Sequence, residues 1–154
     1  MTDLAIEKVA PYSLGEIARL HMAGELKVAE RAYSEYLVEN PSNMSALNLF
    51  GICCNDLGHY KKAERVFEHL LISAPEIVEA RIHLAQSRLC QGNCISALQA
   101  IDGDVPETAS RSEWLLLRAR ILVQLDDLNR GFSFKSDKRL NMTMGLNFSS
   151  AAIT

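Results

Sequence analysis

Residues 44–77 have the sequence MSALNLFGICCNDLGHYKKAERVFEHLLISAPEI. Gly58 stands near the middle, where a glycine commonly ends one helix and lets the chain reverse. Pro75 cannot continue a helix, so it marks the end of a second one. Gly51 and Ala63 are small, which suits two helices that cross at close range. The stretch therefore predicts a pair of helices joined by a tight turn.

The same features recur along the chain at a step of 34 residues. A glycine, an alanine, a ring or branched residue and a proline keep this spacing: Gly24, Gly58, Gly92; Ala29, Ala63, Ala97; Tyr33, Phe67, Ile101; Pro41, Pro75. A period of 34 residues with two helices per unit is the signature of the tetratricopeptide repeat. The chain resembles this family over residues 10–127. The resemblance implies an all-α fold, a right-handed α-solenoid of about three and a half helix-turn-helix units.

The units are expected at residues 10–43, 44–77 and 78–111, with a partial fourth unit at 112–127. The first unit departs from the family pattern at Ser13 and Glu16, where two large residues are usual. The third unit departs at Arg81 and Arg88, which replace apolar residues. Its second helix is expected to be short, because Gly103-Asp104-Val105-Pro106 follows soon after Ile101.

The two ends of the chain lie outside the repeats. Residues 1–9 form an N-terminal segment, and the repeat pattern stops after Asp127. In the tail, residues 128–154, apolar and polar residues alternate from Leu140 to Phe148. Alternation of this kind is typical of a strand. The tail is therefore expected to be disordered or to form a short hairpin.

Composition indicates a folded, soluble protein. The chain has 154 residues, of which 48% are hydrophobic and 23% charged, with a net charge of −3. Residues 1–127 contain 12 Lys/Arg against 18 Asp/Glu, so the repeats are acidic and disfavour nucleic acid as a partner. The N-terminus shows no secretory signal and no apolar run is long enough to span a membrane. A cytoplasmic protein with reduced cysteines is expected.

The sequence offers no candidate for catalysis. It has no Walker phosphate loop, no Gly-x-Gly-x-x-Gly and no His-Glu-x-x-His, and its four histidines share no catalytic spacing. Cys90 and Cys94, together with Cys53 and Cys54, suggest zinc, but buried small apolar residues are the simpler interpretation. We therefore expect no catalytic residue, no metal and no cofactor, and not an enzyme.

The resemblance to the repeat family implies a binding groove lined by the first helix of each unit. The family's groove positions correspond here to Leu14, Ala18, His21, Asn48, Ile52, Asn55, Asp56, Glu79, His83 and Gln86. Chaperone-binding members grip a terminal carboxylate there with a cluster of Lys, Arg and Asn. This set contains no Lys or Arg, so that mode of binding is not expected.

Two functions follow from the resemblance. The first is an adaptor or scaffold that holds a peptide or helix of another protein in the groove. The alternative is the N-terminal repeat region of a larger glycosyl- or sulfotransferase, whose catalytic domain lies outside this chain. The helix expected in the partial fourth unit, from about Ser112 to Leu125, is apolar on more than one face and must be covered. The tail, a second copy in a symmetric homodimer, or a further domain are the candidates for covering it.

Overall fold

The computed structural model describes residues 12–103, 107 and 111–144, with side chains up to residue 131. Seven helices follow one another along the chain: α1 (Leu14–Met22), α2 (Leu26–Glu39), α3 (Met44–Asp56), α4 (Tyr60–Ser73), α5 (Val78–Cys90), α6 (Cys94–Ala100) and α7 (Arg111–Met144). No strand occurs among the described residues, so the predicted all-α fold class is confirmed.

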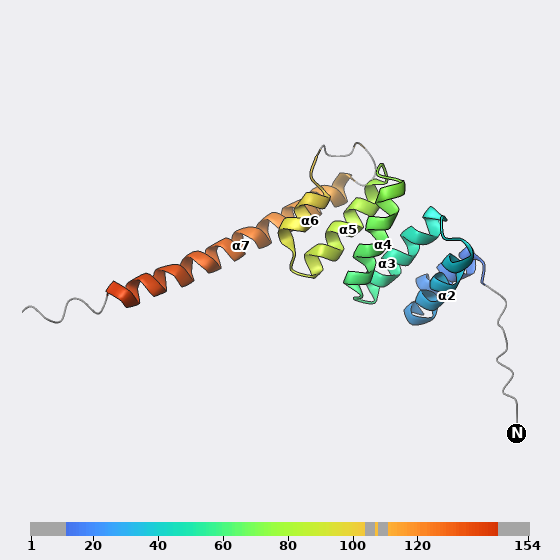
Figure 1. Ribbon diagram of the computed structural model, residues 1–154, viewed down its shortest axis with the longest axis horizontal. Helices are drawn as coiled ribbons and strands as arrows, with labels where there is room; N and C mark the ends of the chain where they lie inside the picture. Colours follow the sequence, from blue (N-terminus) through green and yellow to red (C-terminus); the bar gives the residue numbers. More distant parts are fainter. Residues whose placement is uncertain (1–11, 104–106, 108–110, 145–154) are drawn as a thin grey trace, which may run out of the picture.

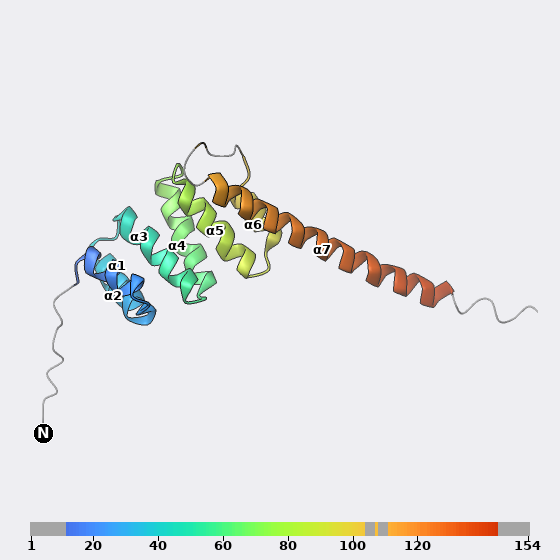
Figure 2. The same cartoon turned by 180° about the vertical axis from the view of Figure 1, so that it is seen from behind.

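The helices stack in pairs. α1 packs on α2, α3 on α4, and α5 on α6, while α2 touches α3 and α4 touches α5. The first helices of the pairs also contact one another in order, α1 with α3, α3 with α5, and α5 with α7. Figures 1 and 2 show this stack from its two sides, with α7 extending beyond it. One surface of the stack is therefore built from α1, α3 and α5, and continues onto the start of α7.

The turn inside each pair is the same in all three pairs. Gly24, Gly58 and Gly92 have positive φ angles of 83°, 75° and 79°. The backbone N–H after Gly58, that of His59, donates to the carbonyl of Cys54 at 2.8 Å, and matching bonds follow the other two glycines. This is the hydrogen-bonding pattern of a helix that ends on a left-handed glycine. The role predicted for Gly58 is confirmed, and it recurs at the 34-residue step.

The crossing of α3 and α4 explains the small residues of the second unit. A Cβ placed on Gly51 would lie 2.6 Å from Cζ of Phe67, which is fully buried. Ala63, one turn before Phe67 on α4, is fully buried as well. A larger side chain at either position would push the two helices apart.

The residues that depart from the family pattern in the first and third units have structural roles. Ser13 and Glu16 form a capping box, in which each side chain accepts a hydrogen bond from the other's backbone N–H at the start of α1. Arg81 donates to the carbonyls of Ala100 (3.2 Å) and Asp102 (2.6 Å), so it caps the end of α6. As expected, α6 is short, with seven residues against fourteen in α2 and α4.

The Arg88 side chain on α5 forms hydrogen bonds to both α4 and α6. Its guanidinium donates to Glu64 at 2.8 Å and to Glu68 at 2.7 Å on α4, and to the carbonyl of Ser96 on α6 at 3.1 Å. Gln91 also donates to Glu64, at 2.9 Å. The residue that departs from the apolar pattern is thus the centre of a polar cluster between two units.

The expectation for the tail was wrong over residues 128–144, which continue α7 as helix. Helix grows by one hydrogen bond per residue once it has started, and nothing between Arg111 and Met144 stops it. That stretch has no proline and one glycine, Gly131. An ion pair of 2.9 Å between Asp126 and Arg130, one turn apart, adds to it. The end of the alternating pattern, residues 145–148, and the rest of the tail to residue 154 lie outside the described residues, as does the N-terminal segment 1–9.

Candidate functional site

The ten predicted groove residues all lie on α1, α3 and α5, and we call the surface that these three helices share the first-helix face. Leu14, Ala18 and His21 are on α1, Asn48, Ile52, Asn55 and Asp56 on α3, and Glu79, His83 and Gln86 on α5. Eight are half-buried, and Asp56 and Glu79 are exposed. The structure therefore places residues that are up to 72 positions apart in the sequence on three helices that contact one another in order.

His21 and Asp56 join the first two units across this face. His21 Nε2 lies 2.9 Å from an Asp56 carboxylate oxygen, and the histidine ring meets Tyr33 edge-on at 6.0 Å. The His21 side chain is only 12% exposed, whereas that of Asp56 is 51% exposed. Asp56 thus orients the imidazole and still presents charge to the surface.

Asn55 joins the second and third units. Its side-chain amide donates to the carbonyl of His83 at 3.3 Å, and its Oδ1 lies 2.8 Å from the hydroxyl of Ser87. Ser87, on α5, is fully buried. Both polar atoms of the Asn55 side chain are therefore engaged within the protein, and this residue holds the face together.

The imidazole of His83 lies flat on Phe67. The centroids of the two rings are 5.5 Å apart, and the ring planes are inclined by 21° to each other. Burial lowers the pKa of His83 below its usual value of 6.5, against the opposing pull of the carboxylates of Glu113, Asp56 and Glu79. A neutral imidazole carries one donor and one acceptor, which suits recognition of peptide groups.

Asn48 differs from Asn55. Its side-chain oxygen is buried and has no hydrogen-bond partner among the described residues. A buried acceptor without a donor is a cost that a suitably placed N–H would relieve. Of the two asparagines, Asn48 is therefore the one with an unused acceptor among the described residues.

The acidic groups give this face its electrostatic character. Asp56, Glu79 and Glu113 come from three successive first helices, and all three act on His83. None of the ten groove residues is Lys or Arg. The charge of the face around His83 is therefore negative, and it favours a neutral or basic ligand.

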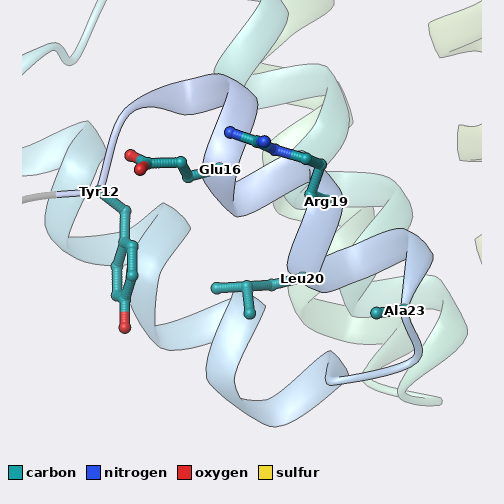
Figure 3. A pocket seen from close by; sticks show the side chains of 5 residues that line it. All are labelled: Tyr12, Glu16, Arg19, Leu20 and Ala23. Atoms are coloured by element: carbon teal, nitrogen blue, oxygen red, sulfur yellow. The ribbon is translucent and has the colours of Figure 1, made fainter.

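A depression lies at the N-terminal end of the stack. It has a volume of about 440 Å³ and is lined by Tyr12, Glu16, Arg19, Leu20 and Ala23. Figure 3 shows Leu20 directed toward the ring of Tyr12, with Glu16 and Arg19 at the other edge. This depression was not predicted from the sequence, because Tyr12 lies before the first helix of the first unit.

The cysteines form no metal site within the described residues. Cys53, Cys54 and Cys94 are buried and Cys90 is exposed, and all four are free thiols. Burial raises the pKa of Cys53 to about 11 and that of Cys54 to about 12. Thiols with such pKa values stay protonated at neutral pH and are poor nucleophiles and ligands. No cluster of three or more His, Cys, Asp or Glu that could bind a metal ion is found in the described part of the chain.

No protein-family model matches the chain, and no curated protein sequence matches it either. The resemblance to the tetratricopeptide repeat rests on the 34-residue spacing and on the repeated turns. None of the helices over residues 12–103 and 111–144 is long and apolar enough to cross a membrane.

Proposed function

We propose that the chain is a tetratricopeptide-type adaptor whose first-helix face holds a peptide or helix of another protein. The observation that carries this proposal is the recurrence of one turn geometry at Gly24, Gly58 and Gly92, which sets three first helices side by side. Repeats of this kind stack into a right-handed solenoid, and their curvature creates an extended binding surface. The protein has no catalytic role in this account and acts in the cytoplasm.

The chemistry of the face favours a particular kind of ligand. Half-buried aliphatic groups such as Ile52 supply contact area, and Asn48 and His83 can pair with peptide groups. The carboxylates of Asp56 and Glu79 favour a segment that carries Lys or Arg. We therefore expect a neutral to basic peptide and not an acidic one.

The test begins with affinity capture by the intact chain, which identifies the bound protein and its binding segment. The affinity of that segment is then measured for the wild type and for a variant with both Asp56→Asn and Glu79→Gln. Two lost charge pairs weaken binding by about tenfold at low salt. The matched control removes two exposed carboxylates from α2, with Glu35→Gln and Glu39→Gln, and keeps wild-type affinity. Equal weakening by both double variants would contradict the assignment of the face.

A further inference from the structure

The second half of α7 stands apart from the helix stack. Among the described side chains, those that pack α7 into the core end at Leu125, and every residue from Asp126 to Gly131 is exposed. Over the described residues, α7 contacts α5 and α6 alone, and Figures 1 and 2 both show it running on away from the stack. Residues 128–144, half of the 34 residues of this helix, therefore form a projecting helix, which we call the distal α7 segment.

The distal α7 segment is basic, whereas the chain before it is acidic. The segment has a net charge of +3, because it contains four basic residues against one acidic residue: Arg130, Lys135, Lys138 and Arg139 against Asp137. Residues 1–127 have 12 Lys/Arg against 18 Asp/Glu, a net charge of −6. Charges of opposite sign on the stack and on the projecting helix attract each other when two copies meet.

The basic residues of the segment follow a helical spacing. Lys135, Lys138, Arg139 and Met142 occupy positions i, i+3, i+4 and i+7 of the helix. Residues at this spacing share one side of a helix, and Asp137 does not belong to the series. It is also the spacing of the anchor residues of a helix that lays one side along another protein. The segment thus has the pattern of a helical ligand with a basic contact side.

The first-helix face and its continuation onto α7 carry acidic groups over a matching length. Asp56 on α3, Glu79 on α5 and Glu113 on α7 are exposed, and their helices contact one another in order; we call these three residues the acidic row. Packed helices lie about 8–10 Å apart, so the row measures about 16–20 Å. The distal α7 segment is about 25 Å long, at about 1.5 Å per residue. One such helix is therefore long enough to cross all three acidic positions.

We propose that the distal α7 segment of one copy of the chain binds along the acidic row of a second copy. This inference rests on the proposed function, since it names a basic helix that the first-helix face can hold. The segment does not reach the face of its own copy while α7 remains one helix, because it runs away from the stack. A contact between two different surfaces leaves one face and one helix unused in every pair, so that copies add head to tail.

Sedimentation velocity of the full chain over a series of concentrations tests this contact. In low salt the wild type should form assemblies that grow with concentration, and high salt should dissociate them, because exposed charges are screened. Lys135→Glu combined with Lys138→Glu should weaken association by at least about tenfold, because two attractions become repulsions. A wild type that stays monomeric in low salt at every concentration would overturn this inference and leave the adaptor function untouched.

Charge reversal in the acidic row gives the complementary variant. Glu79→Lys combined with Glu113→Lys changes two exposed positions and should weaken association as strongly as the variant of the helix. The matched control, Glu35→Lys combined with Glu39→Lys, makes the same change of net charge on α2 and should associate like the wild type. Equal weakening by both double variants would show that net charge and not the acidic row controls association, and would overturn the inference.

Mixing the two reversed variants tests the pairing itself. Each variant alone has a row and a distal helix of like charge and should stay monomeric where the wild type associates. In the mixture, the basic row of one variant meets the acidic helix of the other, so association should return. If the mixture stays monomeric while circular dichroism shows that both variants are folded, the distal α7 segment does not bind the acidic row.

Discussion

Phe67 fills the space that a side chain at Gly51 would need. A Cβ on Gly51 would lie 2.6 Å from Cζ and 2.7 Å from Cε1 of the phenylalanine ring. The ring is fully buried and also stacks on His83, so it has little room to move. This contact fixes the distance between α3 and α4, and through His83 it links the repeat core to the first-helix face.

Gly51→Ala should therefore destabilise the protein by about 1–3 kcal/mol through overpacking. The matched control is Gly15→Ala, a helical glycine of α1 with nothing within 4 Å of the added Cβ. Gly15→Ala should stabilise the protein by about 0.5–1 kcal/mol, because alanine loses less backbone entropy than glycine when a helix forms. Free energies of unfolding from urea titrations measure both. If Gly51→Ala left the free energy of unfolding unchanged, α3 and α4 would have to lie further apart than the contact between Gly51 and Phe67 indicates.

Ala63→Leu should also destabilise the fold, by about 1–3 kcal/mol. Ala63 is fully buried on α4, one turn from Phe67. Ser34→Leu, at an exposed position of α2, serves as the control, since leucine there has room. If the two substitutions changed the urea midpoint equally, the repeat register would be incorrect.

Arg81→Met should destabilise by about 1–3 kcal/mol, because the carbonyls of Ala100 and Asp102 would lose their charged donor. The substitution also removes the cation that lies 5.1 Å from the ring centre of Trp114. Methionine keeps most of the aliphatic part of the arginine side chain. The loss of unfolding free energy therefore measures the contribution of the guanidinium group. Arg65→Met, at an exposed position of α4, should change the unfolding free energy little.

Stability should fall as the pH drops below the unfolded pKa of His83, about 6.5. Burial lowers the pKa of His83 in the folded state, so in this window the unfolded chain binds more protons than the folded one. His83→Gln removes this group and should flatten the pH dependence between pH 7 and pH 5.5. Urea midpoints at several pH values measure it. An unchanged slope in the variant would show that His83 is not the titrating group.

The substitutions Asn48→Ala and Asn55→Ala should differ in their effects on the stability of the protein. Asn55→Ala removes the hydrogen bonds to His83 and Ser87, so it should lower the unfolding free energy by about 1–3 kcal/mol and weaken ligand binding as well. Asn48→Ala removes an oxygen without a described partner and should leave stability nearly unchanged. If Asn48, Asn55 and His83 can all become alanine with no loss of partner affinity, the binding surface lies elsewhere.

The helix pairs and their turns could be predicted from the sequence because each rests on local chemistry. The glycines need positive φ, Pro41 and Pro75 stop helices, and apolar residues recur at one spacing. The roles of Arg81 and Arg88 could not be predicted in this way, since their partners come from neighbouring helices. One local signal was missed, the Ser13-x-x-Glu16 capping box, which marks the start of α1.

The tail shows how a short-range pattern can mislead. Alternating apolar residues predict a strand, yet residues 128–144 continue a helix that begins at Arg111. An established helix extends at little cost, and this outweighs the alternation. For the candidate site, the sequence predicted which helices carry the ten residues. It could not predict that Asn55 is engaged by Ser87, because that contact depends on how α3 and α5 pack.

The most direct test of the central proposal is site-specific photo-cross-linking with the intact chain in cell extract. A photoreactive amino acid is placed at Glu79, which is exposed on the first-helix face, or at Glu35, which is exposed on α2. We expect the partner protein to be cross-linked from position 79 and not from position 35. Cross-linking from position 35 alone, or equally from both, would contradict binding through the first-helix face.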